Sequence, residues 1–188
     1  MKPKLSYAVF GDGSWATAII KMLCENLDEI YWYVRRPQTI EYIQKEKHNP
    51  KYLSSVEFDT SRLNLSCDIN FVASKADILI FVIPSAFIYE QVNHISVDIS
   101  TKIIVSAVKG IVPETGLLVA EHFSKTNHVP MSNIAVIGGP CHAEEVALER
   151  LSYLTIACMN PEISKEVSSR LSSHYIKASI HEDIIGAE

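Results

Sequence analysis

Short apolar runs alternate with amphipathic segments along this chain. The runs 5–10, 30–34 and 78–82 are rich in β-branched and aromatic residues, and they are too hydrophobic to leave one face in water. This pattern is typical of strands buried on both faces in a parallel sheet. The run from Ile78 is the strongest of the three and ends at Pro84. We therefore expect at least three central strands.

Between these runs, hydrophobic residues recur with helical spacing. Ala16, Ile19, Ile20 and Leu23 follow the i, i+3, i+4, i+7 pattern of one helix face. A second helix is expected from Pro37, because proline suits a first helical turn. The other expected elements are a weak strand at 69–71, a helix capped by Ser85 that carries Ile88, Val92 and Ile95, a strand at 102–108, a helix at 115–123, a strand at 134–137, a short helix from about Ala143, a strand at 153–157 and a helix bearing Ile163, Val167 and Leu171.

Strands that alternate with helices of these lengths predict a doubly wound, mostly parallel α/β sheet of the Rossmann type, with helices on both faces. We expect residues 1–188 to form one such domain, without internal repeats. Ligands of these sheets bind in the crevice beyond the carboxyl ends of the strands. The residues that follow each strand are therefore the candidate site residues.

Composition and charge narrow the classes of function. The chain has 188 residues with 17 Lys and Arg against 22 Asp and Glu, a net charge of −5, which argues against a nucleic-acid partner. The longest apolar run has six residues, 78–83, so neither a membrane span nor a signal peptide is predicted, and we expect a cytoplasmic protein. Four cysteines lack a C-x-x-C pair, and no metal site is predicted.

The first apolar run leads into a glycine-rich turn, Gly11-Asp12-Gly13-Ser14-Trp15-Ala16. It matches G-x-G-x-x-[GA], the dinucleotide fingerprint, between a predicted strand and a predicted helix. Gly11 would make the tight turn, Gly13 would let a pyrophosphate approach the backbone, and Ala16 would let helix and strand pack closely. The alternative is a glycine turn without a ligand. The flanking elements favour a dinucleotide site.

Arg35 and Arg36 follow the second strand, where the fingerprint usually brings an acidic residue that holds a ribose 2′-hydroxyl. Two guanidinium groups can instead pair with a 2′-phosphate. We expect NADP(H) to be accepted, alone or together with NAD(H), and the NAD/NADP preference stays open. The alternative is that one or both arginines are ordinary surface charges.

Lys109 and Gly139 follow two later strands of the predicted sheet. A single ammonium group at a strand end, followed by Gly110, is well placed for an anionic or carbonyl-bearing substrate. Cys141-His142 could also suggest a zinc deaminase or a nucleophile pair, but the P-C-x-x-C ligands are absent and an acyl-transfer context is missing. We instead expect the Gly139-Pro140 turn and the following helix start to present backbone amides to a ligand.

Taken in order, these motifs resemble the bacterial-type NAD(P)-dependent glycerol-3-phosphate dehydrogenases, from about Tyr7 to Glu188. The segments that carry the resemblance are 11–18, Arg35-Arg36, His48-Asn49-Pro50-Lys51-Tyr52-Leu53, 82–85, 108–111 and 139–146. The resemblance implies reversible hydride transfer between NAD(P)H and dihydroxyacetone phosphate, giving sn-glycerol 3-phosphate for glycerophospholipid synthesis. A homodimer is the expected assembly, and the oligomeric state stays open.

The resemblance also implies roles for individual residues. The cofactor-binding set comprises Gly11, Gly13, Ser14, Trp15, Arg35, Arg36, Tyr52, Lys109 and Ala143, and the substrate-binding set comprises Lys109, Gly139 and Cys141. The family commonly has Ser at the position of Cys141, and a thiol is a weaker hydrogen-bond donor. The family's proton-transferring lysine and its helical substrate domain would lie beyond Glu188, so we expect this chain to bind cofactor and to turn over poorly by itself. Two alternatives are a related 2-hydroxyacid or 6-phosphogluconate dehydrogenase and a nucleotide-sensing module without catalysis.

Overall fold

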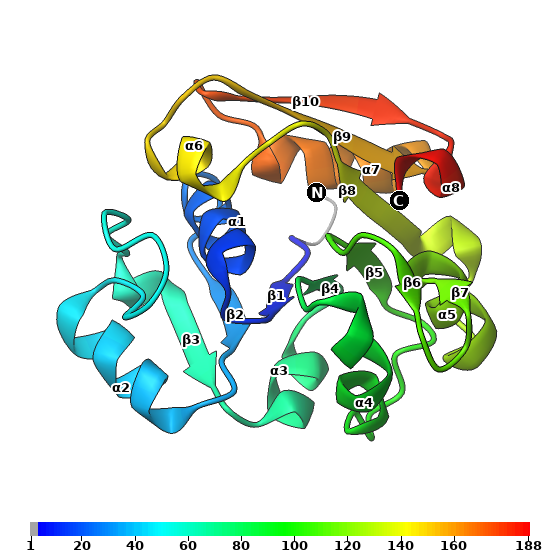
Figure 1. Cartoon of the computed structure of the whole chain (residues 1–188), viewed down its shortest axis with the longest axis horizontal. Helices are drawn as coiled ribbons and strands as arrows, with labels where there is room; N and C mark the ends of the chain where they lie inside the picture. The colour runs from blue at the N-terminus through cyan, green and yellow to red at the C-terminus, as the bar shows by residue number, and fades with distance from the viewer. Residues whose placement is uncertain (1–3) are drawn as a thin grey trace.

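The computed structural model describes residues 4–188 of the chain (Figure 1). The strands are β1 (Tyr7–Phe10), β2 (Ile30–Tyr33), β3 (Leu63–Ser66), β4 (Ile78–Phe81), β5 (Ile103–Ser106), β6 (Ile111–Val112), β7 (Leu117–Leu118), β8 (Ile134–Gly138), β9 (Ser152–Cys158) and β10 (Ile176–His181). The α-helices are α1 (Ser14–Cys24), α2 (Pro37–Glu46), α3 (Ile69–Lys75), α4 (Ile88–Asn93), α5 (Val119–Thr126), α6 (Ala143–Ala147), α7 (Pro161–Leu171) and α8 (Ile184–Ala187). Short 3-10 turns cover Thr60–Arg62, Ser85–Phe87 and Met131–Asn133.

Eight strands form one sheet in the order β10-β9-β8-β5-β4-β1-β2-β3. Neighbouring strands run parallel except β8 and β9, which pair antiparallel with Val136 opposite Ala157. The strand order moves outward from β1 in both directions, so the crevice beyond the carboxyl ends of β1 and β4 is a switch point of the topology. The prediction of a mostly parallel, doubly wound sheet is therefore confirmed.

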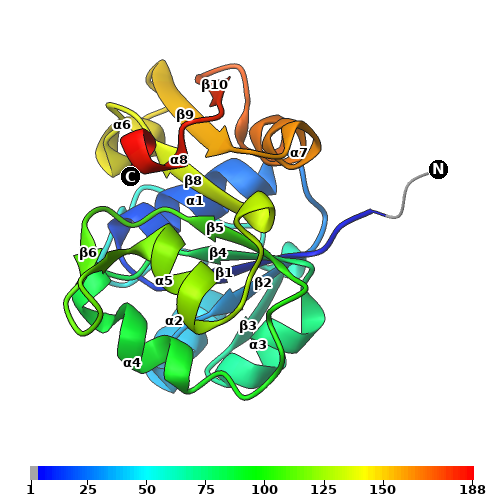
Figure 2. The ribbon, with the colours of Figure 1, turned by 90° about the vertical axis from the view of Figure 1, so that its right-hand side faces the viewer.

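Alternate residues of the central strands enter two separate hydrophobic cores. Tyr7 and Val9 face the core shared with α1, α2, α6 and α7, whereas Ala8 and Phe10 face the core shared with α3, α4, α5 and α8. Figure 2 shows α1 and α7 on one side of the sheet and α4 and α5 on the other. All four β1 side chains are buried, as expected for a strand covered on both faces.

The weak strand expected at 69–71 is wrong, because these residues begin helix α3. The side chain of Asp68 caps this helix by accepting hydrogen bonds from the backbone N–H groups of Asn70 and Phe71 at 2.9 and 3.0 Å. The strand that pairs with β2 lies earlier, at Leu63–Ser66. Its apolar run is too short and too polar to stand out in the sequence.

The helix expected at 115–123 begins only at Val119, because a β6–β7 hairpin occupies the residues before it. Ser85 does not cap α4; it begins a 3-10 turn whose N-cap is Pro84, and Phe87 is the N-cap of the helix. Ile95 lies beyond the end of α4. Strand β10 and helix α8 were not predicted. Within residues 4–188, the molecule has no helix with the length and apolar character required for a membrane crossing.

Candidate functional site at the carboxyl ends of the strands

The turn between β1 and α1 depends on glycine at its first position. Gly11 has φ +130°, and a Cβ atom there would overlap the backbone carbonyl oxygen of Val82, which follows β4. The turn is also held by Trp32, whose indole N–H donates to the Gly11 carbonyl oxygen at 2.7 Å. Gly11 therefore allows β1, β2 and β4 to meet at one point.

Gly13 differs from Gly11, because its own backbone would accept a side chain. Its φ is −81°, and apart from Gly13 itself and its two chain neighbours, no atom of the described residues lies within 4 Å of the position that a Cβ would take. Gly13 is also the N-cap of α1, whose first turn carries neither a side-chain cap nor an acidic residue. Within residues 4–188, no side chain caps this helix N-terminus, and the space beside Gly13 is open, an arrangement that suits a phosphate anion.

A cavity of about 370 Å³ lies beside this turn, and we call it the turn cavity. Its wall includes Tyr33, the hydroxyl of which contacts Gln91 Oε1 at 3.4 Å. Burial raises the pKa of Tyr33 above its usual value, so the hydroxyl is neutral at physiological pH. The turn cavity is lined by Gly11, Asp12, Gly13, Tyr33, Arg35, Tyr52, Val82, Ile83, Pro84, Phe87, Glu90 and Gln91. Its mixture of apolar and hydrogen-bonding groups suits a nucleoside.

A smaller cavity of about 100 Å³, the arginine cavity, lies next to the turn cavity. The two share Asp12, Arg35 and Tyr52 as lining residues. Arg36 completes the predicted pair, and both guanidinium groups are exposed. The structure thus brings the two arginines and Tyr52 to the same region as the glycine turn.

Asn49 connects this region to the glycine turn, and the motif-based prediction gave it no role. Its side chain is buried and donates hydrogen bonds to the Asp12 carbonyl oxygen at 3.1 Å and to Thr17 Oγ1 at 3.0 Å. Its Oδ1 accepts from the backbone N–H groups of Lys51 and Tyr52 at 3.0 and 3.2 Å. One amide group thus fixes the 47–53 loop against the fingerprint. The Asn-Pro dipeptide was the available signal, but it indicated only a loop.

A third cavity, the lysine cavity, has a volume of about 180 Å³ and is lined by Trp15, Ala107, Lys109, Ile137, Gly138, Gly139 and Cys141. It combines residues that follow β5 and β8 with the first turn of α1. Gly139 has φ +112°, and a Cβ there would lie 2.8 Å from the Tyr153 carbonyl oxygen, so this turn also requires glycine. The three predicted substrate residues therefore lie together.

Two of the predicted residues, Ser14 and Ala143, do not line any of these three cavities. Ser14 is the first residue of α1, between Gly13 and Trp15. Ala143 is buried as the first residue of α6, where α6 packs against α1. Burial raises the pKa of the Cys141 thiol, although a hydrogen bond with Ser152 opposes this effect. Cys141 is therefore a neutral thiol at physiological pH, which makes a nucleophilic role unfavourable.

Glu188 was not among the predicted site residues, yet its side chain contacts the end of β5. Its carboxylate accepts a hydrogen bond from Ser106 Oγ at 3.0 Å and from the Ala120 backbone N–H at 3.1 Å. Burial raises its pKa above the usual value, and these two hydrogen bonds counteract the rise. The contacts hold residue 188 beside the carboxyl end of β5, the strand that leads to Lys109.

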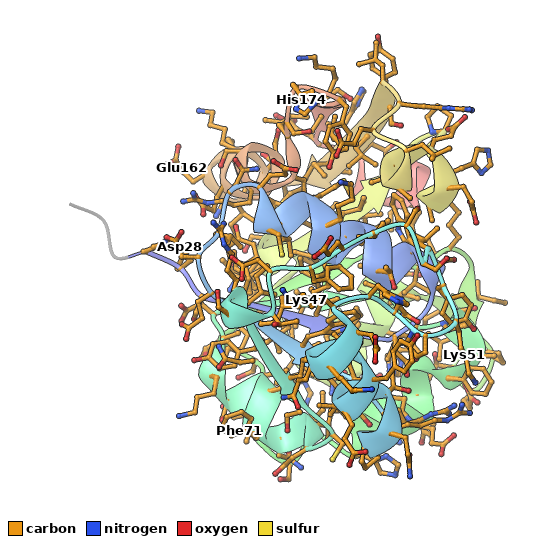
Figure 3. The ribbon with its side chains drawn as sticks, turned by 90° about the vertical axis from the view of Figure 1, so that its left-hand side faces the viewer. Asp28, Lys47, Lys51, Phe71, Glu162 and His174 are labelled. Carbon is orange, nitrogen blue, oxygen red and sulfur yellow. The ribbon has the colours of Figure 1, made fainter. Side chains whose placement is uncertain are left out.

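A larger cavity, of about 570 Å³, contains none of the predicted site residues. It is lined by residues of α7, the start of β5 and the segment before β1. In Figure 3, Glu162 of this cavity lies on the side opposite Lys51, which lines the arginine cavity. Volume alone does not locate the site, because the groups with convergent chemistry lie at the carboxyl ends of the strands.

Comparisons with known proteins agree with this geometry. Residues 6–164 match the family model described as the NAD-dependent glycerol-3-phosphate dehydrogenase N-terminus. A glycerol-3-phosphate dehydrogenase [NAD(P)+] of Limosilactobacillus reuteri is 29% identical over 189 residues, covering 96% of this chain and 55% of the relative. A solved glycerol-3-phosphate dehydrogenase from Coxiella burnetii has a TM-score of 0.83 and 26% identity, with coverage of 97% of this chain and 55% of that one. The enzyme of Saccharomyces cerevisiae, at 21% identity and a TM-score of 0.83, shares the fold. The chain spans about half the length of the curated relatives it matches.

Proposed function

We propose that this chain, which belongs to the NAD-dependent glycerol-3-phosphate dehydrogenase family, binds a dinucleotide. In the proposed reaction, this dinucleotide would reduce dihydroxyacetone phosphate. The observation that carries the proposal is the convergence of three groups of residues at the carboxyl ends of β1, β2 and β5. These are the open glycine turn, the arginine pair and Lys109. When bound, the reduced dinucleotide would supply the hydride that adds to the carbonyl carbon of the substrate.

Separate groups of residues would hold the pyrophosphate and the adenosine of the dinucleotide. The free N–H groups at the start of α1 would bind the pyrophosphate, because Gly13 leaves the space in front of them open. The turn cavity would take the adenosine, with Tyr33 and Gln91 on its wall. Arg35 and Arg36 would face the ribose and any phosphate on it.

The lysine cavity would take the nicotinamide end and the substrate. Lys109 is exposed there, and its ammonium group can donate to a carbonyl or phosphate oxygen. Gly139 would let the substrate approach the backbone, and Cys141 would donate a weak hydrogen bond from its neutral thiol. These groups bind and orient; the proton for the product alkoxide would come from a lysine outside residues 1–188, by the family resemblance.

The family resemblance covers about half the length of the curated relatives. We propose that residues 1–188 form the dinucleotide-binding domain, that the substrate domain lies outside them, and that the chain binds cofactor yet turns over poorly by itself. General acid catalysis contributes roughly 10²- to 10⁴-fold to such reactions. The proposed partner is a small-molecule substrate. The cytoplasmic location and the homodimer stay predictions from sequence.

Binding and turnover test the proposal separately. The 188-residue chain would be titrated with NADH and with NADPH, and quenching of Trp15 and Trp32 fluorescence would report binding. We expect saturable binding of both dinucleotides. A spectrophotometric assay with dihydroxyacetone phosphate and NADPH should give little oxidation. Absence of dinucleotide binding would refute the proposed function, whereas turnover at the rate of a complete dehydrogenase would refute its second part.

A further inference from the structure

The arginine cavity contains a third cation, which comes from a different segment of the chain. Lys51 lies in the loop after α2 and lines this cavity together with Arg35 and Arg36. Within residues 4–188, none of these three cationic side chains forms an ion pair or a hydrogen bond with a protein group. Asp12 is the acidic residue in the lining, so three positive charges face one negative charge. This local excess of cations contrasts with the net charge of −5 of the chain.

The backbone at Lys51 is fixed rather than free. Its N–H donates to Asn49 Oδ1 at 3.0 Å, and the Asn49 amide in turn holds the glycine turn. Pro50, which lies between them, has a restricted φ. In Figure 3, Lys51 lies at the carboxyl-end side of the sheet, whereas Lys47, four residues earlier, lies away from that edge. An anchored backbone lowers the entropy cost of a contact between the ammonium group and a bound anion.

We infer that Lys51 is the third cation of a site for a phosphate monoester on the adenosine ribose, and thereby a determinant of preference for NADP(H) over NAD(H). The inference rests on the proposed function, because it requires the dinucleotide to lie in the turn cavity. A phosphate monoester carries about −1.5 to −2 charges at neutral pH, whereas a ribose hydroxyl carries none. Three cations against one carboxylate therefore favour the phosphorylated form. The arginines provide planar forks, and Lys51 adds a point charge on a flexible side chain from a different segment of the chain.

The test compares Lys51→Met with Lys47→Met, which removes the same charge from an exposed residue outside the cavity lining. Dissociation constants for NADPH and NADH would be measured by fluorescence titration, and folding by urea denaturation. Because the side chain is exposed, we expect Lys51→Met to weaken NADPH binding about fivefold to tenfold. We expect its NADH affinity to stay within about twofold, and Lys47→Met to leave both affinities near parental values.

Each outcome decides between distinct alternatives. Selective loss of NADPH affinity in Lys51→Met, with an unchanged urea midpoint, supports the inference. An equal loss for both dinucleotides, or no loss, overturns it and leaves the proposed function intact, because the parent still binds. If the parent binds neither dinucleotide, the proposed function fails and the inference fails with it.

Discussion

Gly11 and Gly13 lie two residues apart in one motif, yet the structure predicts opposite consequences for their replacement by alanine. At Gly13, φ is −81° and the space that a methyl group would take is empty of protein. Alanine is a poorer N-cap than glycine by up to about 1 kcal/mol, but it also reduces the entropy of the unfolded chain by a similar amount. Gly13→Ala should therefore leave the free energy of unfolding within about 0.5 kcal/mol of the parent.

The cost of Gly13→Ala should appear in binding. The methyl group would occupy the space in front of the α1 N-terminus, where we place the pyrophosphate. Overpacking of a fitted contact costs about 1–3 kcal/mol, which corresponds to roughly 5- to 150-fold in the dissociation constant. We expect NADH and NADPH to lose affinity equally, since both carry the same pyrophosphate.

Gly11→Ala should instead destabilise the fold. Its φ of +130° strains any side chain, at about 1–3 kcal/mol, and its methyl group would overlap the Val82 carbonyl oxygen. Relief of that overlap requires a backbone shift and adds about 1–3 kcal/mol. The total of about 2–6 kcal/mol is a large part of the 5–15 kcal/mol typical of a domain.

Urea denaturation, monitored by circular dichroism, measures the free energy of unfolding of each variant. Fluorescence titration with NADH measures its dissociation constant. Gly116→Ala is the matched control, because its φ of +65° is also strained while nothing lies within 4 Å of its added methyl group. It should cost about 1 kcal/mol and leave NADH binding unchanged. Parental NADH affinity in Gly13→Ala would contradict the assignment of the pyrophosphate site, and parental stability in Gly11→Ala would contradict the argument from backbone overlap.

Three other predictions concern the arginine cavity, its anchor and a buried histidine. Replacing Arg35 and Arg36 together by alanine should weaken NADPH binding about 10- to 100-fold and NADH binding much less; parental NADPH affinity by titration would show that the pair is ordinary surface charge. Asn49→Ala leaves the backbone N–H groups of the loop without their acceptor, and should lower the free energy of urea unfolding by about 1–3 kcal/mol while weakening both dinucleotides; a stability loss without any change in binding would mean that the loop lies outside the site. Burial lowers the pKa of His122 below its usual 6.5, so the unfolded chain takes up the proton first and stability falls as the pH drops from 6.5 through the folded pKa. His122→Gln should reduce this acid-dependent loss in urea midpoints measured between pH 5 and 8, and an identical pH dependence in both proteins would exclude the histidine as its source.

The central strands and the glycine turn could be predicted because their signals are local. The run from Ile78 is hydrophobic on both faces, so its burial in a parallel sheet follows from its own residues. Residues 63–66 have no such run, and β3 forms because β2 offers an edge on which Leu63 pairs with Ile30. The α3 residues were predicted as a strand, because the apolar Ile69 and Phe71 on either side of the polar Asn70 match the alternation of a strand, and this outweighed the capping signal of Asp68. Tertiary pairing and capping thus decided the elements that the hydrophobic pattern left ambiguous.

Some residues of the candidate site could likewise be predicted from local signals, whereas others could not. Gly11, Gly13, Arg35 and Lys109 follow strands of a parallel sheet, and the rule that carboxyl ends share one edge was sufficient to group them. Asn49 follows no strand. Its amide donates to the Asp12 carbonyl oxygen and the Thr17 hydroxyl, 37 and 32 residues away, and accepts from two backbone N–H groups of its own loop. The long-range hydrogen bonds exist only once the chain is folded. Because that single amide fixes the loop that carries Lys51 and Tyr52, this part of the site depends on a residue to which the motifs assigned no role. We therefore expect the glycine turn and the arginine pair, which follow strands, to be predictable from the sequence pattern, whereas the contribution of Lys51 depends on a loop that only the folded chain anchors.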